Sequence, residues 1–186
     1  MLFLVGDNPF HGISHLSQER ARLRGNKVLN PRYAAKLIAL ALDNGADGFM
    51  FSVSETTLTI LRILREMGYS DIILYPIVPY AYEYVRLATS KGLTELSKHI
   101  LWNIVFSGQL RTLTYVIRGT TDPTFLLKAY ITYELHRIRK AVGNQAKISA
   151  ILLHEILTEL IIGFNLRELA TQYVNFSRKI GVRLGF

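Results

Sequence analysis

Four short apolar runs along the chain have the length and composition of buried β-strands: residues 2–6, 48–53, 71–80 and 147–155. They are apolar throughout rather than alternating, which is typical of strands in a parallel sheet that is covered on both faces. The third run is expected to end at Pro76 and Pro79, because proline has no N–H to donate to a ladder. The fourth ends on His154 and Glu155, whose side chains are expected to point to opposite faces of the strand.

Stretches with helical composition follow these runs and predict helices over residues 31–45, 54–68, 81–92 and 165–181. The first helix is expected to begin at Asn30-Pro31, because the Asn side chain accepts from helix amides and proline suits the first helical position. Ser54 is a candidate cap of the second helix. Residues 7–30 are predicted to form a long polar loop.

Residues 93–143 interrupt this alternation, because they contain no convincing strand bounded by turn signals. We interpret them as a helical insertion whose last helix runs from the cluster Thr121-Asp122-Pro123 to Gly143. The order is then β-α-β-α-β-α, the insertion, and β-α. It predicts an α/β fold of parallel β/α repeats in a single domain over residues 1–186. Right-handed crossovers leave a barrel and a doubly wound sheet as alternatives.

The four predicted strands are half the number in a closed TIM barrel, so the architecture we expect is a partial, half TIM-barrel-like fold. An open sheet of this kind exposes strand edges and a wide apolar face, which usually leads to association. The chain is therefore expected to form a homo-oligomer.

Composition narrows the class of protein. Hydrophobic residues make up 49% of the chain and charged residues 19%, which argues against disorder. The absence of cysteine excludes disulfides, thiolate metal sites and cysteine nucleophiles, and it favours an intracellular, cytoplasmic location. No apolar run has the length of a membrane span or a signal peptide. Few methionines and many Ile, Tyr and Arg residues are typical of thermophile proteins.

The net charge of +8 favours anionic partners, either nucleic acid or phosphorylated small molecules. The basic residues are spread along the chain, however, and the densest patch is only RARLR at 20–24. A merely soluble basic surface is the alternative that we favour, so nucleic-acid binding is not expected. No GxGxxG follows the first strand and no GxxxxGK[ST] occurs. The chain therefore lacks the usual fingerprint of the nucleotide-binding doubly wound folds.

Parallel α/β folds bind ligands just beyond the carboxyl ends of their strands, and polar side chains gather at all four such ends here. The candidate general acids and bases are His11, Glu55 and His154. The candidate substrate-binding residues are Asn8, His15, Ser52, Ser54, Tyr80 and Arg20, the last as a clamp for an anionic group. These residues predict a pocket for a small molecule, including an anionic one.

Two of the candidate acid–base residues have structural alternatives. Glu55 lies at a strand-to-helix turn, where an acidic side chain also favours the helix dipole. His154 is equally consistent with a buried histidine that is hydrogen-bonded to a neighbouring carbonyl.

Cofactor binding is left open by the sequence. His11 and His15 are four residues apart, as metal ligands on one helix face would be, but Pro9 and Gly12 oppose a helix there and no HExxH occurs. No metal site is therefore predicted. Tyr80 belongs to a tyrosine cluster that suits a planar ligand such as a flavin, although such tyrosines more often line a core.

The segment GDNPFHGISHLSQERAR resembles the first loop of an uncharacterised prokaryotic family of TIM-barrel-like (β/α) proteins, which reads GxNPFxGxSHxSxER. LLHEILTEL and NLRELATQYVNFSRKIGVRLGF also resemble a strand and a helix of that family. The resemblance covers most of the chain and implies a barrel-type fold with further strands after Phe186. It implies no particular reaction, so no catalytic role is transferred from it.

Three functions remain as hypotheses. The first is a small-molecule enzyme, or a fragment of one, in which a histidine acts as acid or base; a lyase, an isomerase and a hydrolase all fit. The second is a non-catalytic, oligomeric or ligand-binding barrel fragment. The third is an anion-binding or nucleic-acid-binding protein, which requires a basic stripe that the sequence does not show. We favour the first.

Overall fold

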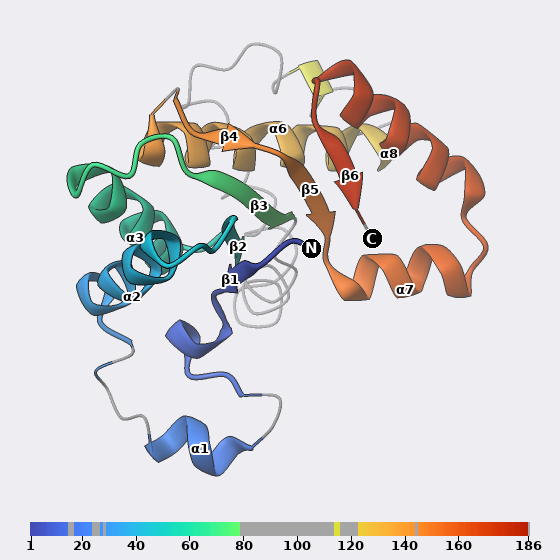
Figure 1. The fold of residues 1–186 in the computed structure, drawn as a ribbon. Coiled ribbons are helices and arrows are strands. Elements are labelled where there is room, and N and C mark those ends of the chain that lie inside the picture. The colour runs from blue at the N-terminus through green and yellow to red at the C-terminus, as the bar shows by residue number, and fades with distance from the viewer. Residues whose placement is uncertain are drawn as a thin grey trace. The chain divides into compact units, whose positions relative to one another are not determined.

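The computed structural model describes residues 1–14, 17–23, 27, 29–78, 114–115, 123–143 and 145–185. Strands and helices alternate along the chain, so the fold class is α/β, as predicted (Figure 1). The chain divides into two compact units, which are described separately. Unit 1 comprises Met1–Ile77 and Arg137–Ala150, and unit 2 comprises Val78–His136 and Ile151–Phe186.

Unit 1 is built on a parallel sheet of four strands: β1 (Leu4–Gly6), β2 (Gly48–Ser52), β3 (Ile73–Val78) and the short β4 (Lys147–Ile148). β2 lies between β1 and β3, and β4 pairs with β3. The spatial order follows the chain without reversal. A doubly wound sheet reverses its strand order at a switch point, so this part of the fold is singly wound.

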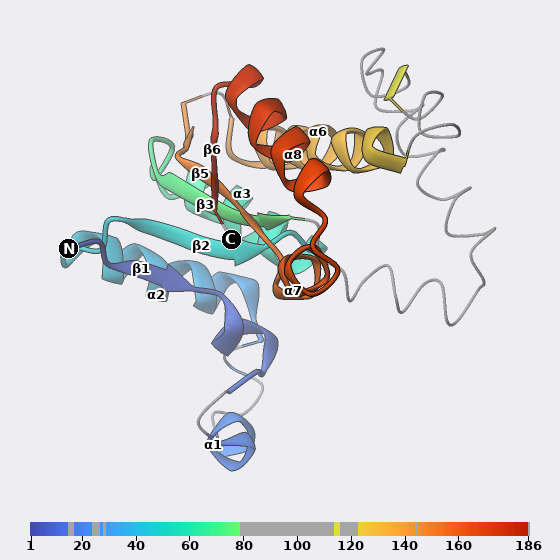
Figure 2. The same ribbon diagram turned by 90° about the vertical axis from the view of Figure 1, so that its right-hand side faces the viewer.

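Two amphipathic helices connect these strands and pack against each other: α2 (Pro31–Asp43) and α3 (Glu55–Glu66). Both helices begin at the predicted caps. The Asn30 side chain accepts from the Arg32 and Tyr33 amides, and Ser54 accepts from the Thr57 amide. Figures 1 and 2 show the two helices beside each other against the sheet.

The core of unit 1 lies between the helices and one face of the sheet. Phe49 and Phe51 of β2 stack with their ring centroids 5.0 Å apart and are fully buried. The helices contribute fully buried side chains such as Ile38, Ile60 and Leu61. Alternate residues of a strand point to opposite faces, and those of the other face, including Met50 and Ser52, are only half-buried.

β3 continues through Pro76 to Val78, although proline was expected to end it. Each residue of a parallel strand directs its N–H toward only one of its two neighbours. On the β4 side, the Leu74 carbonyl accepts from the Ser149 amide at 3.0 Å, and the next residue facing that side is Pro76. The missing N–H therefore interrupts the hydrogen bonding between β3 and β4, and β4 ends at Ile148. It does not interrupt β3, which continues to Val78.

The predicted loop over residues 7–30 contains two helical elements, which corrects the sequence interpretation. The 3₁₀-helix η1 covers Asn8–His11 and the α-helix α1 covers Gln18–Leu23. Both are short, and η1 ends at Gly12, whose φ of 69° lies in the left-handed region. Periodicity cannot detect elements of one or two turns, because they contain too few residues to repeat a pattern.

The described part of unit 2 includes most of α6 (Pro123–Val142, which reaches into unit 1), most of β5 (Ala150–Leu153), and the whole of α7 (Glu155–Gly163), α8 (Arg167–Lys179) and β6 (Arg183–Gly185). β5 and β6 are neighbours in the sheet. α6 corresponds to the predicted helix that ends at Gly143. The predicted helices over 81–92 and within 93–122 lie outside the described residues, apart from 114–115.

Three expectations for this region were wrong. The predicted strand 147–155 is two strands with a break at Ser149, and it ends at Leu153, so that His154 and Glu155 begin α7 instead. α7 was not predicted at all. The final segment, Arg183–Gly185, forms β6, which raises the strand count above the expected four.

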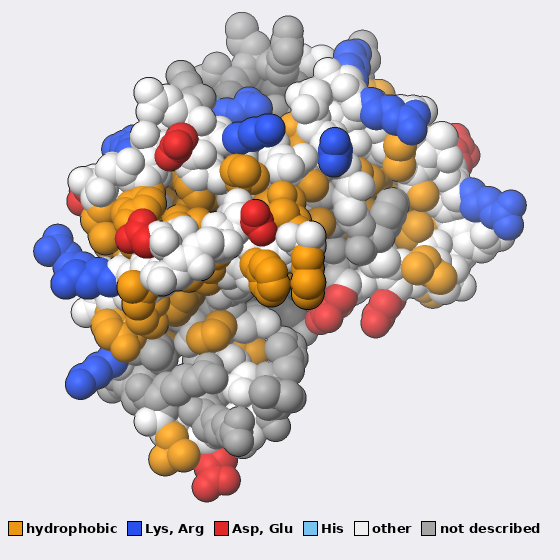
Figure 3. All heavy atoms as spheres, in the orientation of Figure 1, with side chains coloured by type: hydrophobic (Ala, Val, Ile, Leu, Met, Phe, Trp, Pro, Cys, Tyr) orange, Lys and Arg blue, Asp and Glu red, His pale blue; other side chains and the backbone are white. Residues whose placement is uncertain are grey.

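None of the helices in the described part of the chain combines the length and the apolar character that crossing a membrane would need. Figure 3 shows hydrophobic side chains at the surface of unit 1. Leu2, Phe3 and Leu40 are each more than half exposed there.

Gly48→Ala is expected to lower the free energy of unfolding by about 2 kcal/mol, because it overpacks the sheet. A Cβ atom at Gly48 would lie 2.5 Å from the Ile73 carbonyl oxygen, which belongs to the backbone of the adjacent strand. Gly6→Ala is the matched control, because its Cβ would meet only the Met50 Cε atom at 4.0 Å. Urea denaturation measures both, and equal unfolding midpoints would contradict the packing of β2 against β3.

Candidate functional site

A buried carboxylate connects the carboxyl ends of the first two strands of unit 1. Asp7 follows β1 directly, and its Oδ2 atom accepts a 2.7 Å hydrogen bond from the Ser52 amide at the end of β2. Asp7 is only 3% exposed. A buried charge is tolerated when it is hydrogen-bonded, so this contact both satisfies the carboxylate and holds the two strand ends together.

The turn after Asp7 brings a histidine back to the same carboxylate. The Asp7 carbonyl accepts from the Phe10 amide at 2.8 Å, which starts η1, and Phe10 anchors the turn in the core. One further residue along, the His11 Nε2 atom lies 3.2 Å from Asp7 Oδ2. Nε2 is buried and forms no well-aligned hydrogen bond, so the contact with Asp7 is electrostatic.

An aspartate beside a histidine is a common arrangement for proton transfer. The carboxylate holds the imidazole in one orientation and complements the positive charge that the ring carries when it is protonated. The His11 side chain is 18% exposed, so a small part of it is open to solvent. The Asp7–His11 pair therefore has the composition and partial access of an acid–base site at a strand end.

Both predicted substrate-binding serines, Ser52 and Ser54, form structural hydrogen bonds. Ser52 uses its amide for Asp7, and its carbonyl accepts from Thr57 Oγ1 at 2.7 Å. The Ser54 hydroxyl accepts from the Thr57 amide at 3.2 Å, and Thr57 Oγ1 accepts from the Ser54 amide at 2.9 Å. Ser54 and Thr57 thus form a capping box at the start of α3.

Glu55 lies in the first turn of α3 with its side chain 73% exposed. Its carboxylate is 2.7 Å from the Arg137 guanidinium of α6 and 3.8 Å from that of Arg62. Both arginines compete with a substrate for the lone pairs that a general base needs. The structure therefore places Glu55 in a surface ion-pair cluster of unit 1.

His154 caps a helix in unit 2. It is buried, and its Nδ1 atom accepts from the Ile156 amide at 3.3 Å, which makes it the N-cap of α7. A nitrogen that accepts this hydrogen bond is unprotonated, so the proton of the neutral ring is assigned to Nε2. The structural alternative for His154, a bond to a neighbouring carbonyl, stays a prediction beside this bond to a backbone amide.

The structure brings together only part of the predicted set. Asn8 and His11 share η1, beside Asp7, and Ser52 joins them through its amide. His15 and Tyr80 lie outside the described residues, and Arg20 lies on α1 with an undescribed side chain. His154 belongs to unit 2, so the convergence of all strand ends on one pocket stays a prediction.

Asp7 lies among the polar residues at the end of the first predicted strand, but the sequence reasoning gave it no acid–base or substrate-binding role. It is the first polar residue after an apolar strand, and this position was the available signal. Its partner Ser52 lies 45 residues away in sequence, so no local pattern connects the two. Among the described residues, no group of three or more His, Cys, Asp or Glu side chains is arranged to hold a metal ion.

Comparison with protein-family models, with curated proteins and with solved structures finds no match to this chain. The resemblance of GDNPFHGISHLSQER to the first loop of a barrel family therefore stays a prediction.

Asp7→Ala is expected to destabilise the protein by about 2–3 kcal/mol, because it leaves the Ser52 amide without its acceptor. Asp7→Asn keeps one side-chain oxygen for that amide and should lose about half as much. Urea denaturation gives both values, and the exposed Asp71→Ala is the control. A stability loss no larger than that of Asp71→Ala would show that the strand-end contact contributes nothing.

Ser54→Ala is expected to lower the free energy of unfolding by about 1 kcal/mol, as the loss of an N-cap does. Thr59→Ala on the same helix is the control, because its hydroxyl takes no part in the cap: it donates to the Glu55 carbonyl at 2.8 Å and accepts from Arg62 at 3.3 Å, both on the helix surface. Thermal or urea unfolding with the two variants side by side measures the difference. Equal stability would argue that the capping box is not formed in solution.

Proposed function

We propose that unit 1 is the acid–base part of a small-molecule enzyme, with the ligand bound at the carboxyl ends of β1 and β2. His11 is the general acid or base, and Asp7 is the positioning residue that orients its imidazole. The observation that carries this proposal is the 3.2 Å contact between His11 Nε2 and the buried Asp7 carboxylate. Singly wound β/α folds place their active sites at this end of the sheet.

The chemistry that this pair supports is the movement of one proton. Imidazole takes up and releases a proton near neutral pH, and a lyase, an isomerase and a hydrolase each need such a step. Asn8 is adjacent to the pair in sequence and can orient a substrate oxygen, and Arg20 can hold an anionic group. Glu55 follows the end of β2 in unit 1 and stays in the proposal as a residue of the wider pocket, because a substrate of ordinary size contacts several strand ends. The acid–base role of His154 in unit 2 stays a separate prediction.

The larger assembly is also part of this proposal. The singly wound sheet of unit 1 is consistent with a TIM-barrel-like architecture and with a homo-oligomer. The composition is consistent with a cytoplasmic location and with a thermophile origin. A non-catalytic ligand-binding module is the second candidate. It is favoured by the roles of Ser54 and His154 as helix caps, because each cap leaves fewer groups for catalysis.

A fragment library followed by amide NMR tests where small molecules bind. Fragments are expected to shift the amide signals of Asn8, His11 and Ser52 together, because these residues meet at the strand ends. In His11→Gln the affinity for such fragments should fall about tenfold, the loss of one good polar contact. His136→Gln on α6 is the matched control, and its affinity should be unchanged.

A measurement of turnover distinguishes the enzyme hypothesis from the binding-module hypothesis. In a panel of small esters, hydroxy acids and sugar phosphates, the reaction that the protein accelerates should slow by about 10²–10⁴-fold in His11→Gln, as loss of a general acid or base does. Asp7→Asn should reduce the rate while His136→Gln does not. Turnover that survives His11→Gln would refute the catalytic role, and fragments that bind elsewhere would refute the site.

A further inference from the structure

A groove in unit 2 lies between the last turns of α8 and the amino end of β6. Its volume is about 450 Å³, which is within the range of small-molecule sites. Val174 and Arg178 line it from α8, and Gly181, Arg183 and Leu184 line it from the turn and the strand that follow. The proposed acid–base site belongs to unit 1, so this groove is a separate feature of the molecule.

A hydrogen-bonded turn joins the two walls of the groove. The Gly181 amide donates to the Arg178 carbonyl at 3.1 Å, and the Val182 amide donates to the Ser177 carbonyl at 3.0 Å. With Gly181 at a φ of 73°, these bonds form a Schellman motif at the end of α8. The turn therefore fixes where β6 starts relative to the helix, and with it the backbone positions of Arg178 and Arg183.

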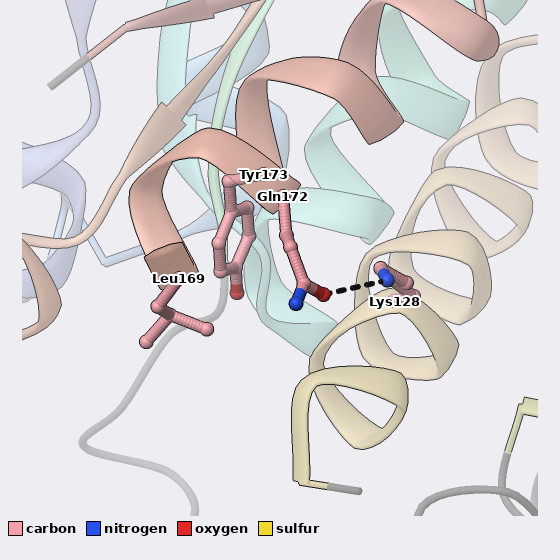
Figure 4. Close-up of a pocket in the computed structure, with 4 residues that line it drawn as sticks. All are labelled: Lys128, Leu169, Gln172 and Tyr173. Atoms are coloured by element: carbon pink, nitrogen blue, oxygen red, sulfur yellow. Dashed lines mark hydrogen bonds between the residues drawn. The ribbon is translucent and has the colours of Figure 1, made fainter. Parts of the chain in front are cut away.

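The contact between α8 and α6 uses a different side of α8. Figure 4 shows the Gln172 side chain pointing from α8 toward Lys128 of α6, and Lys128 Nζ donates to Gln172 Oε1 at 3.1 Å. Residues two positions apart on an α-helix lie roughly 200° apart around its axis. Val174 therefore lies on nearly the opposite side of α8 from Gln172, and the helix is held against α6 without using the side that lines the groove.

The groove carries positive charge, and no acidic side chain is among the described residues that line it. Arg178 and Arg183 are both exposed, and neither forms an ion pair within the part of the chain that the structure describes. A cation in the last turn of a helix complements the helix dipole, which accounts for Arg178. Arg183 follows the helix in β6, so the dipole does not account for it. Two cations that line one groove repel each other, and an anion between them would relieve that repulsion.

We propose that this groove binds a small phosphate monoester with an apolar body. Each arginine presents a planar set of N–H donors that matches the oxygens of a phosphate group. A phosphate monoester carries about two negative charges near neutral pH, so two guanidinium groups suit it better than they suit a carboxylate with one charge. Val174, Val182 and Leu184 supply an apolar surface for the rest of the ligand. The net charge of +8 favours an anionic ligand as well.

Phenyl phosphate is the probe, titrated into the whole chain and followed by amide NMR. The amide signals of Gly181, Arg183 and Leu184 are expected to shift together, with a dissociation constant of about 1 mM or lower for a ligand of this size. Inorganic phosphate should bind about tenfold more weakly, because it lacks the ring that covers the apolar surface. Benzoate should bind about fivefold more weakly, because it keeps the ring but carries only one charge.

Arg178→Gln and Arg183→Gln should each weaken phenyl phosphate binding about tenfold, because each removes charged hydrogen bonds. Both side chains are exposed, so the thermal unfolding temperature should stay nearly unchanged. Lys179→Gln is the matched control, because Lys179 is exposed and adjacent to Arg178 but does not line the groove. Its loss changes the net charge equally and should alter the affinity by no more than about twofold, since it removes only screened attraction.

Absence of binding at about 20 mM phenyl phosphate would overturn the proposal, because a formed site binds a ligand of this size more tightly. Equal weakening by Lys179→Gln would show that only the general positive charge matters. Equal affinities for benzoate or for inorganic phosphate would refute the phosphate monoester as the ligand class. Tighter binding of a single-stranded oligonucleotide than of phenyl phosphate would refute it as well, and would assign the groove to a nucleic-acid interface instead.

Discussion

The arrangement of unit 1 depends on one buried carboxylate, that of Asp7. A charged group that is 3% exposed is unfavourable unless its oxygens are engaged, and the Ser52 amide supplies a 2.7 Å hydrogen bond. That contact holds the end of β1 against the end of β2 and sets the direction in which the chain leaves the sheet. Because η1 starts from the Asp7 carbonyl, the same residue also determines where His11 lies.

Polar residues gather at the ends of parallel strands for two different reasons, and the structure separates them. A chain that leaves a parallel strand soon enters a helix, whose first amides need acceptors. Ser54 and His154 meet that need for α3 and α7. Asp7 and His11 are not caps of an α-helix, and their side chains face each other, which is why they carry the proposal of an acid–base site.

The same distinction applies to polar groups in unit 2. The Tyr173 hydroxyl is buried and unpartnered, whereas the Ser177 hydroxyl is satisfied by the Val174 carbonyl at 2.9 Å on the same helix. Local back-bonding to the preceding turn is the usual solution for a polar side chain within a helix. Tyrosine cannot use it, because its hydroxyl lies too far from its own backbone, and it therefore needs a partner from another element.

The sequence by itself determined the strands and helices that have strong local signals. The apolar runs at β1, β2 and β3 and the caps Asn30 and Ser54 act within a few residues, so local patterns predicted these elements. α7 was not predicted because its first residue, Glu155, was assigned to the preceding strand, and a helix of nine residues is too short to repeat a clear helical pattern. The path of β3 through Pro76 depended on which neighbour its missing N–H faces, and only the tertiary structure decided that. The pairing of Asp7 with Ser52 across 45 residues was decided in the same way, because hydrogen bonds between strands follow from register, and register is a property of the folded sheet.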